Sequence, residues 1–212
     1  MSAASRRPAR RSSGAALLLA ALAAWPVAAA AAGAPASGSA PALERFLSGR
    51  RDVVSLRARF VQEKHVALLE EPLVSRGRFS FRRGHGFRWE VEEPERFVVE
   101  VAGGVLRAGP PGELRAIEGG PAADLLAGLG GLLAGAEPAA GFDVRNTGRP
   151  DVLVLRPRDP RLARSIASIE LELDRETGVP RGLRIREPNG DRTRIELGGV
   201  RVERAPGASP AS

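Results

Sequence analysis

The strongest constraint on this 212-residue chain is a hydrophobic alternation of period two that begins at Val53. Leu56, Ala58 and Phe60 alternate with arginines and a valine, and a similar alternation runs through Phe79. This pattern is typical of antiparallel strands with one apolar and one solvated face. In the second half, further strand-like runs occupy residues 152–155, 166–173, 183–185, 193–197 and 200–202. The sequence therefore predicts a mainly β protein with about ten strands.

Turn-forming residues separate these runs. Glycine and proline fall at residues 84–86, 93–95, 103–104 and 109–112. Residues 174–178 and the Asn189-Gly190 pair predict hairpin loops. Strands joined by such short turns form a meander, and an antiparallel sheet this large curls. If the sheet does not close, a helix must cover its open apolar face.

Two segments have helical rather than strand character. Leu43, Phe46 and Leu47 recur at helical spacing and predict a short amphipathic helix from about Pro41 to Gly49. Residues 121–136 are apolar and helix-compatible but contain four glycines, which weaken a helix. Two interpretations of this insert remain open: a mobile lid over the sheet, or a poorly formed core helix.

The ends of the chain predict export. Residues 1–32 combine four arginines, an apolar stretch and a run of small residues, which is typical of a secretory signal peptide. We expect cleavage between Ala30 and Ala36, although an uncleaved membrane anchor is the alternative. Residues 33–40 then form a flexible linker, 41–204 the folded domain and 205–212 a disordered tail. The expected location is the periplasm, where a chain with no cysteine must rely on core burial.

Composition argues against several function classes. Without the four arginines of residues 1–32, the formal charge falls from +7 to about +3, so nucleic acid is not an expected partner. His65 and His85 lack a metal-ligand partner at useful spacing, which predicts surface histidines and no metal site. No nucleophile elbow or phosphate loop is present in the sequence. We therefore expect no catalytic residues, no cofactor and no enzyme activity.

The apolar positions of the alternating runs are the candidate binding residues. They form either a plain core or the wall of a lipid cavity between the sheet and the helical insert. Glycines in the covering segment favour the cavity, because a permanent core gains nothing from an interrupted helix. The candidate cavity residues are Phe60, Leu73, Phe79, Phe81, Phe87, Trp89, Phe97, Val99, Leu125 and Leu129.

Several motifs together resemble the periplasmic outer-membrane lipoprotein carrier (LolA) family. The chain has F-x-Q-x-K from Phe60 to Lys64, followed by G-x-F-x-F-R-R from Gly77 to Arg83. F-R-W-E then begins at Phe87, and an acidic-proline step follows it. The combination covers residues 56–102, and the later resemblance is architectural.

This resemblance implies an unclosed antiparallel β-barrel, or half-barrel, with an N-terminal helix and a helical lid over an apolar cavity. It implies a chaperone in lipoprotein transport that accepts acyl chains from an inner-membrane ATP-driven release complex. An outer-membrane acceptor would then take the cargo, and we expect the carrier to be a monomer. By the same resemblance Arg83 is the lid latch, whose guanidinium bonds to lid-loop carbonyls and holds the empty cavity shut.

The sequence departs from the family in two places. Gly84 follows Arg83 where the family usually has proline, and no F-x-F-x-P segment precedes Arg204. Three alternatives therefore remain open. One is a pathway-dedicated carrier of a glycolipid or lipid-linked pigment, another is a lipid-sensing regulatory domain, and the third is an enzyme on a lipocalin-like scaffold.

Overall fold

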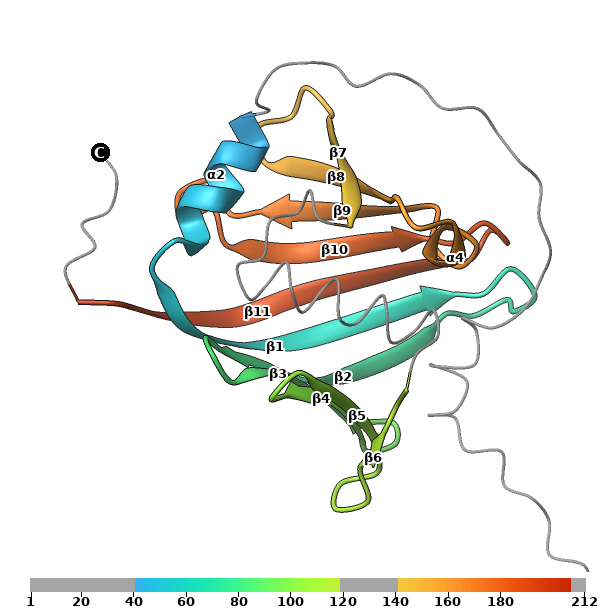
Figure 1. Cartoon of the computed structure of the whole chain (residues 1–212). Helices are drawn as coiled ribbons and strands as arrows, with labels where there is room; N and C mark the ends of the chain where they lie inside the picture. The colour runs from blue at the N-terminus through green and yellow to red at the C-terminus, as the bar shows by residue number, and fades with distance from the viewer. Residues whose placement is uncertain (1–40, 119–140, 207–212) are drawn as a thin grey trace, which may run out of the picture.

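In the computed structural model, which describes residues 41–118 and 141–206, the chain forms one eleven-stranded antiparallel sheet (Figure 1). Within β1–β6 and within β7–β11, each strand pairs with the next one along the chain. Their bounds are β1 Val53–His65, β2 Leu73–Arg82, β3 Gly86–Glu93, β4 Phe97–Ala102, β5 Val105–Gly109, β6 Arg115–Ala116, β7 Phe142–Asn146, β8 Val152–Pro157, β9 Ser168–Leu173, β10 Pro180–Arg186 and β11 Arg192–Arg204.

The order of strands across the sheet is β6-β5-β4-β3-β2-β1-β11-β10-β9-β8-β7. Each half of the sheet is a meander, and the two halves meet where β1 pairs with β11. Both of these central strands are 13 residues long, and their pairing runs from Val53 opposite Arg204 to His65 opposite Arg192. Because β6 and β7 remain as edges, the sheet is not closed into a barrel. The predicted mainly β fold, with an unclosed antiparallel sheet and an N-terminal helix, is confirmed.

Two helices flank the sheet in the described residues. Helix α2 spans Pro41–Arg50, one residue beyond the predicted end, and lies beside β8 (Figure 1). The four-residue helix α4, Pro160–Ala163, was not predicted; Asp159 caps it by accepting a hydrogen bond from the Arg161 amide. In the described part of the chain, neither helix is long and apolar enough to cross a bilayer.

Some predicted boundaries were wrong. Ile166 does not belong to a strand, because its amide bonds to the Leu162 carbonyl in the turn after α4. Residues 200–202 continue β11 instead of forming a strand of their own. Strands β6 and β7 carry no alternation long enough to recognise, since they contain two and five residues. The predicted helical insert at 121–136 lies outside the described residues.

The core lies along one face of the sheet. Phe60, Leu153, Leu155 and Ile169 are almost fully buried there, and Phe46 of α2 packs against the same cluster. Lacking tyrosine and cysteine, the chain builds this core from phenylalanine and aliphatic side chains. Gly84 and Gly190 take positive φ angles of 76° and 94° at two of the hairpin turns, a conformation that costs glycine little.

Candidate functional site

The apolar face of β1–β4 gathers most of the chain's aromatic side chains. Register places Phe79 of β2 opposite Trp89 of β3, and Phe81 opposite Phe87. The Phe60 and Trp89 rings stack with centroids 4.0 Å apart, and Phe79 lies 5.8 Å from the Trp89 ring. Aromatic pairs at these separations attract one another beyond their area burial. The result is a continuous aromatic wall across neighbouring strands.

Most of the candidate cavity residues lie on this apolar face. Phe60, Phe79, Phe81, Phe87 and Val99 are buried, whereas Trp89 and Phe97 are half-buried and pack against the core. Leu73 is 39% exposed at the start of β2 and stands apart from the aromatic wall. Leu125 and Leu129 lie outside the described residues.

Gly77 makes room for the aromatic wall. A Cβ atom at this position would lie 1.9 Å from the Glu90 carbonyl oxygen and 2.8 Å from Cζ of Phe60. Neither distance is possible for a real side chain, so glycine lets the Phe60 ring pack closely over β2. In the sequence, Gly77 falls at a position whose side chain would point to the apolar face. The need for glycine there becomes visible only once the Phe60 ring is placed over it.

One end of the apolar face is polar. Lys64 and Glu187 are buried and joined by a 2.9 Å ion pair between Nζ and Oε1. Gln62 lies opposite Ser75 on the same face, and the Ser75 hydroxyl is buried with no hydrogen-bond partner. Sequence reasoning missed this cluster. The signal was available, because Lys64 and Gln62 follow Phe60 at intervals of two.

Arg83, the predicted lid latch, bonds to backbone carbonyls at the end of α2 and the start of β1. Its Nη2 donates to the carbonyl oxygens of Arg50, at 3.0 Å, and Arg51, at 2.7 Å. Its Nε donates to the Val53 carbonyl at 2.8 Å. The guanidinium therefore holds helix α2 against the sheet. Its bonding to a lid loop stays a prediction, because the predicted lid lies outside the described residues.

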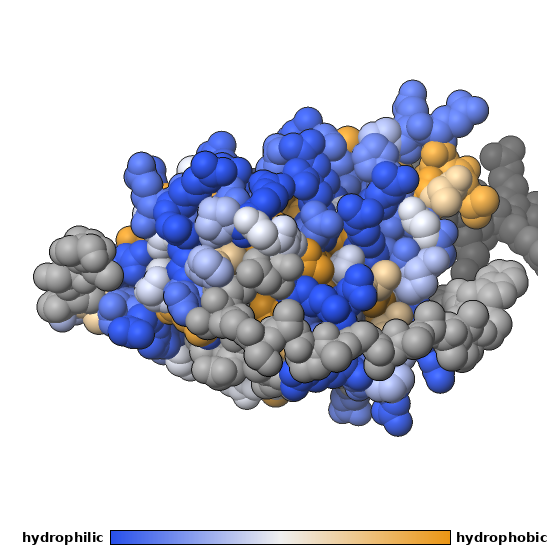
Figure 2. Space-filling model, turned by 90° about the horizontal axis from the view of Figure 1, so that it is seen from above, coloured by the Kyte–Doolittle hydropathy of each residue, from blue (hydrophilic) through white to orange (hydrophobic). Residues whose placement is uncertain are grey.

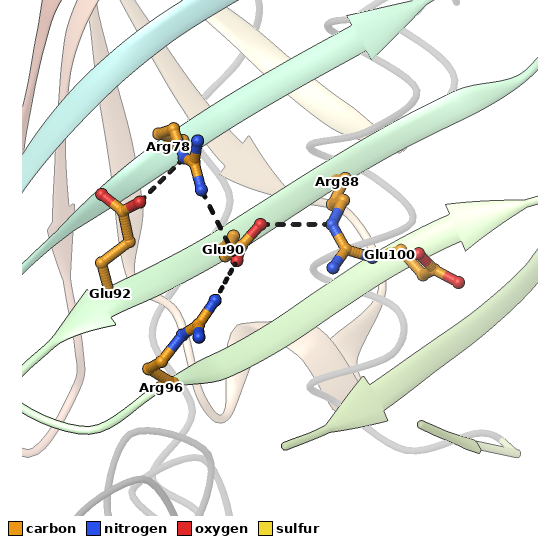
Figure 3. Close-up of polar contacts among 6 residues, drawn as sticks. All are labelled: Arg78, Arg88, Glu90, Glu92, Arg96 and Glu100. Carbon is orange, nitrogen blue, oxygen red and sulfur yellow. Dashed lines mark hydrogen bonds and ion pairs between the residues drawn. The ribbon is translucent and has the colours of Figure 1, made fainter. Parts of the chain in front are cut away.

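The opposite face of the same strands is charged. Arg78, Arg88 and Arg96 surround Glu90, with Glu92 and Glu100 extending the network (Figure 3). Burial alone would raise the pKa of Glu90, but hydrogen bonds from Arg96 and Arg88 and the charge of Arg78 outweigh it. The pKa of Glu90 therefore lies below its usual value of 4.5. Such interleaved pairs keep this face solvated, as the alternation predicts.

Two hollows of the described surface lie on the charged face of the sheet. One, of about 260 Å³, is lined by residues that include Arg57, Arg82 and Arg88. The other, of about 370 Å³, lies over β9–β11 and includes Glu172 and Arg184. Neither is the predicted apolar cavity, which stays a prediction together with its lid.

The described residues hold no group of three or more His, Asp or Glu side chains arranged to bind a metal ion. His85 lies exposed in the turn between β2 and β3, and His65 is exposed at the end of β1. The carboxylates near the aromatic wall point to the charged face and pair with arginine. The best-defined candidate site is therefore the apolar face.

The chain was compared with known protein families, curated proteins and solved structures. No family model and no curated protein matches the chain. A LolA superfamily protein from Nitrosomonas europaea is 12% identical, covering 78% of this chain and 93% of that chain with a TM-score of 0.45. A domain from Vibrio parahaemolyticus, described as an outer membrane lipoprotein-sorting protein, is 10% identical over 79% of this chain and 92% of that chain, with a TM-score of 0.46.

The structure of the MucA/MucB complex from Pseudomonas aeruginosa is also similar, at 22% identity and a TM-score of 0.41. The match covers 80% of the present chain but only 57% of the chain in that complex. Likenesses at these values say nothing of a ligand, which must be argued from the residues of the chain itself. The LolA superfamily, which residues 56–102 resemble in sequence, is represented among these similar solved structures.

Proposed function

We propose that this protein is an exported, non-enzymatic carrier that holds lipid acyl chains against the aromatic face of β1–β4. The cargo is the acyl chains of lipoproteins or of a related lipid, moved through the periplasm from the inner to the outer membrane. The observation that carries the proposal is the gathering of Phe60, Phe79, Phe87 and Trp89 on one face of an open sheet. Six of the chain's seven phenylalanines are in this wall, in α2 or in β4.

An aromatic wall binds hydrocarbon chains well, because removing both apolar surfaces from water lowers the free energy. Burying apolar area contributes roughly 25 cal/mol per Å², without any requirement for direction. A carrier needs such non-directional binding, because its cargo must leave again without breaking specific bonds. Trp89 and Phe97, which are only half-buried, are the members of the wall best placed to meet a ligand first.

The lid belongs to this proposal. The proposed lid is the insert at residues 121–136, and Leu125 and Leu129 are its proposed cavity residues. Arg83 is the proposed latch. Its three hydrogen bonds to the carbonyls of Arg50, Arg51 and Val53 are charge-assisted, each worth about 1.5–3 kcal/mol, strong enough to hold a segment yet breakable.

The partners follow from the same proposal. An inner-membrane ATP-driven release complex would supply the cargo, and an outer-membrane acceptor would remove it. The secretory leader at residues 1–32 would deliver the chain to the periplasm, where both partners are reached. A sensor role, in which the same lipid-binding domain regulates another protein, requires the same apolar face.

One observation favours a second candidate, a pathway-dedicated carrier of a glycolipid or another lipid with a polar group. The buried Ser75 hydroxyl lacks a partner in the described structure and lies beside Gln62 at the end of the aromatic wall. An unsatisfied buried hydroxyl costs about 1–3 kcal/mol, and a polar atom of a ligand would relieve that cost. Hydrocarbon alone would not.

Lipid binding can be tested on protein purified from the periplasm of an exporting bacterial host. Native mass spectrometry should find acyl lipid bound to it. Trp89 is one of only two tryptophans, and the other lies in the predicted leader, so its fluorescence reports the apolar face. A fluorescent fatty acid that accepts energy from Trp89 should bind saturably.

Two matched variants complete the test. Phe97→Ala on the apolar face should weaken fatty-acid binding by about tenfold, since burying a phenylalanine contributes about 1.5–3 kcal/mol. Glu92→Ala on the charged face of the neighbouring strand should leave binding unchanged. A folded protein that carries no lipid and binds no fatty acid would reduce the aromatic wall to a structural core.

A further inference from the structure

The charged face is not balanced throughout. Arginine lies opposite arginine at several places, as at Arg59–Arg78 and Arg184–Arg194, but there at least one arginine of the pair also has a glutamate partner. One row across the strands is especially rich in arginine: Arg201 of β11, Arg57 of β1, Arg88 of β3 and Arg107 of β5 lie in register, with Ser80 and Glu100 between them. We call this set the arginine row. It contains four arginines and one glutamate, and therefore carries a net positive charge.

The centre of the arginine row sets like charges side by side. Arg57 lies directly opposite Arg201 across the β1–β11 seam, and both side chains are exposed. Like charges directly opposite each other destabilise a sheet. Among the described residues, neither has an ion-pair partner. The sheet thus retains an unfavourable pair that a single glutamate in place of either arginine would relieve.

The arginine row opens into the smaller of the two surface hollows. Arg57 and Arg88 line it together with Arg82 and His85 from the β2–β3 turn region. Ser80 also lines it and brings a hydroxyl donor. The only carboxylate in its lining, Glu100, is engaged by Arg88 at 2.8 Å. Phe81, Phe87 and Val101 are also part of the lining. Its guanidinium groups and hydroxyl are donors suited to phosphate oxygens.

We propose that the arginine row and its hollow form a docking site for the phosphate headgroups of an anionic lipid membrane. A guanidinium pairs with a phosphate in a bidentate manner, so each exposed arginine can bind a separate headgroup. From β11 to β5 the row crosses five inter-strand steps, which is about 24 Å at the usual strand spacing. A row of that length can contact several lipid headgroups at once.

The composition of the row favours a membrane over a protein partner. Protein interfaces need an apolar or aromatic centre from which water is excluded. No member of the row is a large apolar residue. The most exposed leucines lie instead in the β1–β2 hairpin, where Leu68 is 93% and Leu69 50% exposed. Figure 2 shows a hydrophobic group at that end of the molecule. The proposal goes beyond lipid carriage, because it holds even if the apolar face is only a core.

The test is co-sedimentation of the host-processed protein with vesicles of phosphatidylglycerol and phosphatidylcholine in equal parts. Each arginine near an anionic surface strengthens binding about fivefold. The variant Arg57→Gln/Arg82→Gln/Arg201→Gln should therefore bind about a hundredfold more weakly than the unchanged protein. Binding should fall as salt rises and be absent on pure phosphatidylcholine.

Two matched variants make the result specific. Arg156→Gln/Arg164→Gln/Arg192→Gln removes the same charge from exposed positions outside the row and should bind as well as the unchanged protein. Leu68→Ser/Leu69→Ser tests insertion of the hairpin and should also leave binding intact. Equal loss in both arginine triples would show that only net charge matters, and loss in the leucine variant would assign docking to the hairpin. Either result overturns the proposal.

A competition experiment distinguishes binding to a membrane surface from binding of a small anion. Inorganic phosphate, added at constant ionic strength, should not displace the protein from vesicles, because one ion replaces only one of several headgroups. Complete displacement by millimolar phosphate would show a small-anion pocket and overturn membrane docking. Circular dichroism on every variant confirms that the sheet is intact, as expected for exposed positions.

Discussion

The two faces of β1, β2 and β3 share one backbone but are held by different forces. On the apolar face, Phe60, Phe79 and Trp89 contact one another and are removed from water. On the charged face, Arg78 and Glu90 pair across the same strands while remaining partly solvated. Hydrophobic burial is worth several times more per residue than a surface ion pair. Stability therefore resides on one face, which leaves the other free to change its charge.

The first prediction tests this difference directly. Phe60→Ala should lower the free energy of unfolding by about 4 kcal/mol, because it removes a buried ring and leaves a cavity beside Trp89. Arg59→Ala, the next residue on the charged face, should change it by no more than about 0.5 kcal/mol. Urea denaturation followed by circular dichroism measures both. Equal losses would mean that the charged face contributes more than its exposure suggests.

A buried charge on the apolar face provides the second prediction. Lys64→Leu should lower the free energy of unfolding by about 3 kcal/mol, because Glu187 would be left buried without its partner. The double variant Lys64→Leu/Glu187→Leu should return to within about 1 kcal/mol of the unchanged protein. Urea denaturation of the four proteins in this cycle measures the coupling. A double variant as unstable as the single one would mean that the ion pair itself stabilises the fold.

The third prediction concerns Arg83, which joins helix α2 to the strands. Arg83→Leu should cost about 2 kcal/mol, since three backbone carbonyls lose a charged donor. Hydrogen exchange should show faster opening at the end of α2, with little change in β8–β10. The neighbouring Arg82→Leu, on an exposed side chain, serves as the control. Uniform loss of protection across the sheet would contradict a local role in holding the helix.

The smallest effect is expected on the charged face in acid. Because its pKa in the folded protein lies below 4.5, Glu90 stabilises the fold fully above that pH. Its contribution disappears as the pH falls from 4.5 through the lowered value. Glu90→Gln should therefore cost less than about 1 kcal/mol at neutral pH and flatten the stability profile below pH 4.5. A profile that keeps its slope would assign the acid sensitivity to other carboxylates.

The sequence was most informative where the alternation is long. Strands β1 to β4 could be predicted because apolar residues recur in them at intervals of two, as at Phe79 and Phe81, and glycine or proline marks the turns between them. The unclosed sheet followed from the number of strands and the resemblance in residues 56–102. Strand β7 and helix α4 could not be predicted, because each is too short for its period to be recognised.

The candidate site was predicted in part. Its aromatic members could be predicted from the alternation of side chains between the two faces of each strand. The alternation alone does not show that Leu73, near the end of a hairpin, is exposed. The partners of Arg83 and the pairing of Lys64 with Glu187, 123 residues apart, depend on tertiary contacts. The arginine row was missed for a related reason. Its members come from separate strands and meet only when the sheet registers are known.

The β1–β11 seam sets the order in which the sheet can assemble. Within residues 53–116, and again within 142–204, every strand pairs with the strand next to it in the sequence. The seam instead pairs Val53 with Arg204, so its formation closes a very long loop. A chain synthesised or translocated from its N-terminus cannot complete the sheet until the last strand has emerged. Until then the edge of β1 has no β11 partner, and an open edge of this length can pair with other chains. Premature arrest before residue 192 should therefore yield aggregates rather than a smaller stable domain.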